Sequence, residues 1–138
     1  MDDLLEWGRR VLAEQPFSRL LGAELASFTS GQAELRIPIR DELRQQFGFV
    51  HGGVVSFAAD NALTYAGGSV LGANVVTAEY KINYLRPALG EMLVARATVV
   101  HSGKTQAVCR CDVYVVRDGD ESLCATAQGT ITKRGEPG

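Results

Sequence analysis

Residues 52–70 read GGVVSFAADNALTYAGGSV. At helical spacing the apolar residues of this segment cover nearly the whole circumference; they are Val54, Val55, Phe57, Ala58, Ala59, Ala62, Leu63, Tyr65 and Ala66. A helix that is apolar almost all round is normally buried. The segment therefore predicts a central helix that the rest of the domain encloses.

Strand-like runs lie on both sides of this helix. Two precede it, at residues 22–28 and 32–39, with Ser30-Gly31 as a hairpin turn between them. Four follow it with short turns between them, at residues 75–86, 91–101, 105–117 and 122–133. Short turns of this kind predict an antiparallel meander. We therefore expect an α+β domain, with an antiparallel sheet of about six strands wrapped round the central helix.

The two ends of the chain add little to this core. Residues 1–16 have apolar residues at helical spacing and predict a short amphipathic helix that Pro16 ends. Residues 134–138 have the composition of a tail. The whole chain, residues 1–138, is thus predicted to be a single domain.

Composition excludes several classes of protein. The 138 residues are 46% apolar, enough for a real core, and 14 Lys and Arg against 16 Asp and Glu give a net charge of -2. That balance offers no basic field for nucleic acid or for an anionic membrane. No run approaches the roughly 18 apolar residues of a transmembrane helix. The start carries acids where a signal peptide needs bases, so we expect a cytoplasmic protein.

Three cysteines are present, Cys109, Cys111 and Cys124. We interpret them as small buried hydrophobic residues, with a metal or redox role as the alternative. Because the chain has neither a CxxC pair nor a cluster of histidines, we expect no metal site.

Polar residues are few in the central helix, and three of them share one stripe. Ser56, Asp60 and Thr64 follow each other at intervals of four. An ionised carboxylate in apolar surroundings costs several kcal/mol unless it is paired or solvated. Asp60 either locks the helix by accepting a hydrogen bond from Thr64 or a backbone amide, or is an acid or base poised in a cleft.

A second group of residues stands just before the helix, in QQFGFVHGG at residues 45–53. Two glycines at a helix start favour close approach of a ligand to the backbone. The unpaired N-H groups of the first turn can also stabilise an oxyanion. His51 alone would be interpreted as a structural histidine, but its combination with Asp60 is more specific.

Over these residues the chain resembles the hotdog-fold acyl-CoA thioesterases of the 4-hydroxybenzoyl-CoA and phenylacetate-degradation type. The resemblance covers residues 17–133, and it is strongest over 45–53, Asp60, Thr64 and 80–88. It implies a hotdog fold and hydrolysis of an aryl- or short- to medium-chain acyl-CoA to the free acid and CoA. No metal and no cofactor beyond the CoA of the substrate are implied.

The resemblance also implies a role for each catalytic residue. Asp60 attacks the thioester carbonyl or activates a water, and Thr64 positions that acid or water. The Gly52 N-H polarises the carbonyl, His51 orders the loop, and Gln45 orients water or substrate. Some family members carry Glu at the position of Asp60, and the shorter side chain leaves both mechanisms open. We favour a general base acting through a bridging water.

Further residues are candidates for binding the substrate. The resemblance brings the Thr77 hydroxyl to the acid of a neighbouring subunit, and Gly53 belongs to the helix start that a ligand approaches. Arg86 and Lys104 are candidate partners of the CoA phosphates. Gly103, Lys104 and Thr105 resemble the family's turn along the CoA arm, although an ordinary hairpin turn is the alternative.

We expect a homodimer, paired further into a homotetramer, because the strand at 75–86 is an edge that a second sheet can extend. The resemblance implies active sites in which Gln45 and Gly52 of one chain face Asp60 and Thr64 of the other. Two alternatives remain open: a non-catalytic acyl-CoA-binding protein and a hotdog hydratase or dehydratase. Two further questions stay open: which acyl group the substrate carries, and whether its thiol is CoA or an acyl carrier protein.

Overall fold

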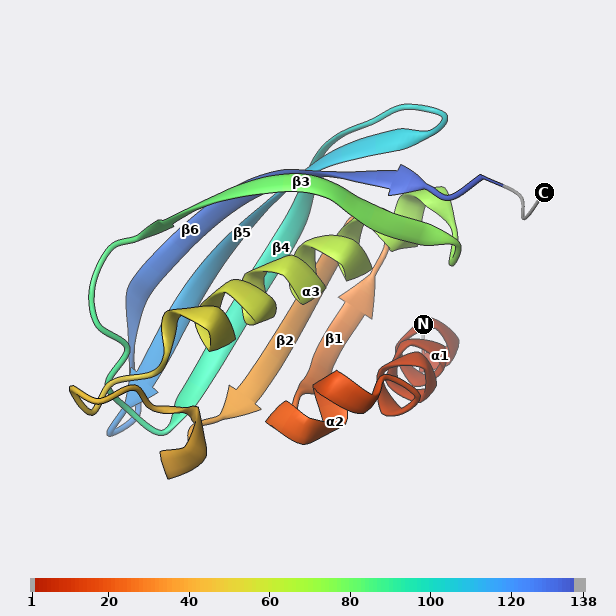
Figure 1. The fold of residues 1–138 in the computed structure, drawn as a ribbon. Coiled ribbons are helices and arrows are strands. Elements are labelled where there is room, and N and C mark those ends of the chain that lie inside the picture. The colour runs from red at the N-terminus through yellow and green to blue at the C-terminus, as the bar shows by residue number, and fades with distance from the viewer. Residues whose placement is uncertain (1, 136–138) are drawn as a thin grey trace.

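A computed structural model describes residues 2–135, in which one antiparallel sheet of six strands curves around a long helix (Figure 1). The helix is α3 (Gly52–Leu71), and ten of its residues are buried. The predicted α+β architecture is confirmed. The strands are β1 (Glu24–Thr29), β2 (Gln32–Pro38), β3 (Val75–Tyr84), β4 (Met92–Ser102), β5 (Gln106–Arg117) and β6 (Asp120–Lys133).

The order of the strands in the sheet is β1-β2-β4-β5-β6-β3. The predicted meander is therefore right for β4, β5 and β6 but wrong for β3, which pairs with β6 and forms an edge. The segment between β3 and β4 is a crossover rather than a tight turn. Its Ala88 is buried, and the Ala88 carbonyl accepts the Val50 N-H at 3.1 Å, which fixes the crossover against the loop before α3.

Two tight hairpins have the turn chemistry that the sequence predicts. Thr29 pairs with Gln32 across Ser30-Gly31, as expected. At the β5–β6 turn, Asp118 and Gly119 both have positive φ, 52° and 84°. Type I′ turns need this conformation, and Asp-Gly is one of the pairs that favour them.

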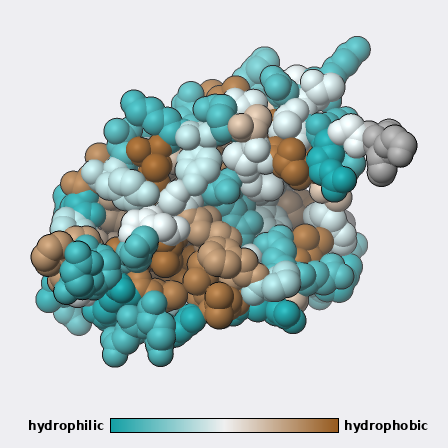
Figure 2. All heavy atoms as spheres, in the orientation of Figure 1, coloured by the Kyte–Doolittle hydropathy of each residue, from teal (hydrophilic) through white to brown (hydrophobic). Residues whose placement is uncertain are grey.

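The N-terminal segment forms two helices, α1 (Asp2–Ala13) and α2 (Pro16–Leu21). The prediction that Pro16 only ends a helix over residues 1–16 is wrong, because α1 ends at Ala13 and Pro16 begins α2. Proline is favoured at this first helical position, where its missing N-H has no partner to lose. Figure 2 shows an apolar patch over α2 and the start of α3. Phe17 and Leu20 of α2 are both exposed.

α1 lies close against β1. A Cβ atom on Gly8 would come within 2.7 Å of Leu25 and 2.8 Å of Phe28, so only glycine allows this approach. The Tyr65 hydroxyl, from α3, donates to the Gly8 carbonyl at 2.9 Å. Burial raises the pKa of Tyr65 to about 12, which keeps this donor protonated. The position of α1 relative to α3 is therefore fixed by both packing and a hydrogen bond.

Cys109, Cys111 and Cys124 are each at most 2% exposed and carry no disulfide, which confirms their interpretation as buried residues. Burial raises the pKa of Cys109 and of Cys124 to about 11. Within residues 2–135 no helix has the length and hydropathy of a transmembrane span. Of the predicted tail, Arg134 donates its N-H to the Asn74 carbonyl, and residues 136–138 lie outside the described part of the chain.

Candidate active site

The polar stripe of α3 faces the edge strand β3. The Thr77 hydroxyl of β3 donates to Asp60 Oδ1 at 2.6 Å. The Thr64 hydroxyl donates to the Asp60 carbonyl oxygen at 2.8 Å and lies 2.9 Å from the Thr77 hydroxyl. The Ser56 hydroxyl also joins α3 to β3, through a hydrogen bond with the Tyr80 hydroxyl. The spacing of four predicted this common stripe, and the three α3 side chains are all partly buried.

A bulge in β3 brings Thr77 to this site. Strict alternation along β3 would place Thr77 on the same face as the exposed Glu79. The pairing with β6 shifts between Thr77 and Glu79, so that Ala78 is an extra residue and Thr77 turns inward. Thr77 then contacts Asp60 of its own chain, whereas the family resemblance implied the acid of a neighbouring subunit.

The Asp60 carboxylate has an unusual set of partners. No Lys, Arg or His lies within ion-pair distance of it among residues 2–135, and its one hydrogen-bond donor is the Thr77 hydroxyl. Thr64 bonds the backbone of Asp60, so the locking alternative, with Thr64 on the carboxylate, is not the observed contact. Oδ1 is held in place, and Oδ2 has no partner among the described residues. A carboxylate of this kind is oriented and free to take a proton.

The start of α3 leaves one backbone donor unused. The Gly53 N-H donates to His51 Nδ1 at 2.8 Å, and the N-H groups of Val54 and Val55 donate to the His51 carbonyl. The Gly52 N-H has no acceptor among the described residues. Because Nδ1 accepts, the neutral His51 ring carries its proton on Nε2. The Gly52 N-H is thus available to an acceptor, whereas the N-H of Gly53, a predicted ligand contact, is already bonded.

Gln45 lies folded on its own loop. Its Oε1 accepts the Phe47 N-H, and its backbone N-H donates to the Phe49 carbonyl at 2.9 Å. The loop turns at Gly48, whose φ of 91° favours glycine. The amide nitrogen of the Gln45 side chain has no partner among the described residues, so this group remains free to donate to a water or a substrate.

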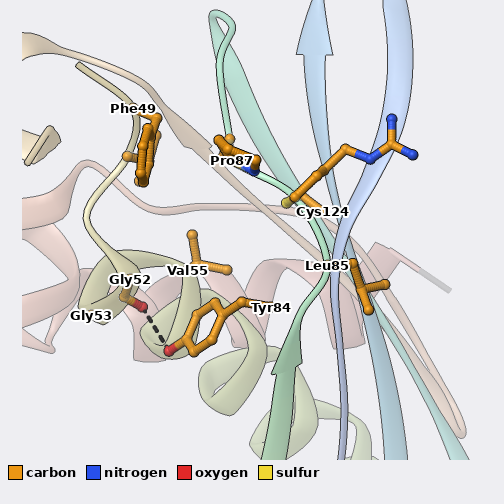
Figure 3. Close-up of a pocket in the computed structure, with 11 residues that line it drawn as sticks. Phe49, Gly52, Gly53, Val55, Tyr84, Leu85, Pro87 and Cys124 are labelled. Carbon is orange, nitrogen blue, oxygen red and sulfur yellow. Dashed lines mark hydrogen bonds between the residues drawn. The ribbon is translucent and has the colours of Figure 1, made fainter. Parts of the chain in front are cut away.

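A pocket of about 530 Å³ opens beside Gly52 (Figure 3). The Tyr84 hydroxyl donates to the Gly52 carbonyl at 3.1 Å and joins the end of β3 to the start of α3. The sequence alone predicted no role for Tyr84. The lining residues are Phe49, Val50, Gly52, Gly53, Val55, Tyr84, Leu85, Arg86, Pro87, Ala88 and Cys124.

The predicted phosphate-binding groups lie at opposite ends of the sheet. Arg86 follows the end of β3 and lines the pocket beside Gly52. The turn at residues 103–105 stands next to the start of β3, because Gln106 pairs with Thr132, which in turn pairs with Val76. Ten residues of β3 correspond to about 30 Å. Within one chain, Arg86 and Lys104 therefore cannot bind the same phosphate. Gly103 and Thr105 belong to the same turn as Lys104.

The two halves of the candidate site are also separated within one chain. Gly52 and Asp60 are eight residues apart on α3, which corresponds to about 12 Å along the helix axis. A single carbonyl cannot touch both groups at that distance. Residues 2–135 contain no group of three His, Cys, Asp or Glu side chains that could hold a metal ion.

Comparison with known proteins identifies the family to which this chain belongs. Residues 47–124, which include Gly52 and Asp60, match the model of the Thioesterase superfamily. The chain belongs to the thioesterase superfamily. It is a thioester hydrolase, and its sheet around a central helix is the hotdog fold.

Three similar proteins illustrate the range of this family. A thioesterase family protein from Silicibacter pomeroyi has a crystal structure that matches with a TM-score of 0.88 and 38% identity, over 94% of this chain and 96% of that one. Acyl-coenzyme A thioesterase 13 of Pongo abelii is 34% identical over 85% of this chain and 83% of its own length. The 1,4-dihydroxy-2-naphthoyl-CoA hydrolase of Listeria monocytogenes is 24% identical over 75% and 85%.

Proposed function

We propose that this thioesterase hydrolyses an aryl- or short- to medium-chain acyl-CoA to the free acid and CoA. The observation that carries the proposal is the Asp60 carboxylate, which the Thr77 hydroxyl orients and which no cation of residues 2–135 neutralises. The unused Gly52 N-H supplies the complementary group. Similarity to an acyl-coenzyme A thioesterase and to a naphthoyl-CoA hydrolase supports CoA as the thiol.

In the proposed mechanism Asp60 is a general base. Oδ2 accepts a proton from a water whose oxygen attacks the thioester carbonyl, and the carbonyl oxygen becomes an oxyanion. The Gly52 N-H donates to that oxyanion, and such a donor is typically worth about 2.7 to 4 kcal/mol. The carbonyl then re-forms as the C–S bond breaks, and the leaving thiolate takes up the proton that Oδ2 had accepted, which restores the base. Thr77 and Thr64 hold the base, while His51 holds the helix start that carries Gly52.

The active site of this proposal is shared between two chains. The separation of about 12 Å between Gly52 and Asp60 supports it, since each would need a partner from another copy. The edge strand β3 supports it too, because its N-H and C=O groups lack a strand on one side. Val76, Tyr84 and the adjacent Leu85 are 44%, 55% and 51% exposed there. Pairing of two β3 strands would cover them in a dimer, which could associate further into a tetramer.

Arg86 is the proposed contact for a CoA phosphate in this arrangement. It is exposed and forms no ion pair among residues 2–135. It lines the same pocket as Gly52, so the CoA arm would pass it on the way to the carbonyl. The turn at 103–105 would serve the site of another chain. No metal, and no cofactor other than the CoA of the substrate, takes part in the proposal.

The decisive experiment mixes two inactive variants. Gly52→Pro removes the proposed oxyanion donor at the first helical position, which accepts proline, and His51 before it has a compatible φ of -58° and ψ of 134°. Asp60→Asn removes the base. With shared sites, random exchange of the two chains at equal amounts restores about a quarter of wild-type activity, because half of the dimers hold one intact site.

Release of free thiol from a panel of acyl-CoAs is the readout. No recovery after proven subunit exchange would contradict the shared site. Binding of acyl-CoA by the wild type without any thiol release would instead indicate the binding module. Double-bond hydration in its place would indicate the hydratase.

A further inference from the structure

A second pocket lies on the other side of the Asp60 cluster, between α1, α3 and the start of β3. Its volume is about 130 Å³. Apolar groups make most of its wall, and Thr64 connects it to the catalytic acid through Thr77. The lining residues are Trp7, Val11, Gln15, Phe28, Asn61, Thr64, Tyr65, Gly68, Gly72, Ala73 and Val75.

We propose that this pocket receives the acyl group and that Trp7 and Val11 of α1 set the size of acyl group that fits. This inference rests on the proposed function and adds its specificity. Thr64 is one helical turn beyond Asp60, about 6 Å along the axis. An acyl chain whose carbonyl lies at Asp60 therefore reaches the mouth of the pocket within a few bonds.

The volume gives the limit on size. An apolar cavity of about 150 Å³ in another protein holds benzene. A pocket of about 130 Å³ thus holds one ring or a chain of about six carbons, and the rest of a longer chain would lie outside this volume.

The wall formed by α1 is held firmly enough to impose that limit. Gly8 packs against Leu25 and Phe28, and the Tyr65 hydroxyl bonds the Gly8 carbonyl. The Trp7 ring stacks on Phe28 with 6.4 Å between centroids.

Several polar atoms of the pocket wall are already hydrogen-bonded within the chain, which favours an apolar acyl group. Gln15 Oε1 accepts a hydrogen bond from the Ser18 hydroxyl at 2.5 Å. Asn61 Nδ2 lies 3.4 Å from the same hydroxyl as a donor to it. Ser18 is only 1% exposed, so these hydrogen bonds are part of the wall, and the three atoms that form them are not free to solvate a charged substituent.

Trp7 also provides a direct probe, because it is the only tryptophan of the chain. In Asp60→Asn protein, which the proposed mechanism makes slow, we expect benzoyl-CoA and hexanoyl-CoA to shift the Trp7 emission, and CoA alone not to shift it. Val11→Phe fills the pocket and should weaken binding of benzoyl-CoA at least about tenfold, the effect of roughly one or two methylenes. Val100→Phe is the matched control, since Val100 is 59% exposed on β4.

Activity gives the complementary readout. With Asp60 intact, Trp7→Ala should raise kcat/KM for decanoyl-CoA relative to hexanoyl-CoA about tenfold or more, because it opens the wall. An equal emission shift with CoA alone would overturn the inference. So would a preference for acyl chain length that is the same as in the wild type in both Val11→Phe and Trp7→Ala, provided that both variants are folded. Thermal melting checks folding of each variant. If no acyl-CoA is hydrolysed by the wild type, the proposed function fails, whereas the Trp7 emission still tests the pocket.

Discussion

Two carboxylates on opposite faces of the sheet have opposite surroundings. On the face away from α3, Glu34 receives Arg36 at 2.6 Å and Arg96 at 2.8 Å, and Arg96 also binds Glu121 through two nitrogens. On the side of α3, the Asp60 carboxylate receives only the Thr77 hydroxyl from residues 2–135. Glu34 thus has two cationic partners, while Asp60 has an oriented oxygen and no counter-ion among the described residues.

The difference appears in what each acid can do. Burial raises the pKa of Glu34, but the hydrogen bonds from Arg96 and Arg36 outweigh burial and hold that pKa below its ordinary value. An acid in this state stays charged and contributes to stability. An acid that only hydroxyls hold can exchange its proton with a substrate or a water. The comparison therefore separates a carboxylate with a structural role from the one that we propose as the general base.

Asp60→Asn provides the largest expected effect. The amide keeps the shape of the side chain but cannot accept the proton, so kcat should fall about 10²-fold or more. The melting temperature should change little. Steady-state thiol release and thermal melting measure the two quantities on the same preparation.

Glu34→Gln is the reciprocal variant for this test. It leaves Arg36 and Arg96 with a neutral partner and should lower stability while kcat stays near that of the wild type. If Asp60→Asn kept wild-type turnover, or if both variants lost activity and stability in parallel, the distinction between the two acids would be lost.

Thr77→Val tests how Asp60 is held. It removes the one donor to Oδ1 while keeping the shape, and a hydrogen bond to a charged group is worth about 1.5 to 3 kcal/mol. Because Thr77 acts through Asp60, we expect a drop in kcat of about tenfold with little change in KM. Thr77→Ser should restore most of the loss. A valine variant as active as the wild type would show that Asp60 needs no such support.

Much of this site was predictable from the chain, for reasons that particular residues make clear. The apolar circumference of residues 52–70 predicts the buried helix, and intervals of four predict that Ser56, Asp60 and Thr64 share a stripe. Both features depend on local periodicity, which a sequence displays directly. The resemblance then supplied roles that spacing alone could not give.

The predictions that were wrong concern features that depend on contacts between distant segments. The bulge at Ala78 leaves no mark in β3 itself, because it follows from the register with β6 fifty residues later. The place of β3 beside β6, and not β4, likewise depends on the crossover at Ala88. Proline is compatible with both the end and the start of a helix. The sequence around Pro16 therefore did not distinguish the start of α2 from the end of the first helix.

The smallest expected effect is a loss of folding stability at acidic pH. Glu34 and Glu121 both have a pKa below the ordinary value of 4.5, Glu34 because the arginine hydrogen bonds outweigh burial, and Glu121 because of its hydrogen bonds from Arg96. A depressed pKa means that the unfolded chain binds protons first as the pH falls, so stability is complete above about pH 5 and declines below 4.5. Since Arg96 and Glu121 are 40% and 39% exposed, solvent screens their pair. The decline attributable to the cluster should be about 1 kcal/mol.

Urea denaturation at pH 7 and at pH 3.5 measures this decline, and Arg96→Gln separates the cluster from the other acids of the chain. Without Arg96, Glu121 loses its cation and Glu34 loses one of two, so both should titrate nearer their ordinary values. The variant should therefore be less stable than the wild type at pH 7, and the gap between the two should narrow at pH 3.5, where the carboxylates of both proteins take up protons. A gap of constant size at both values would mean that Arg96 stabilises the sheet through its stacking on Tyr114, at 4.9 Å from the ring centre, and not through charge.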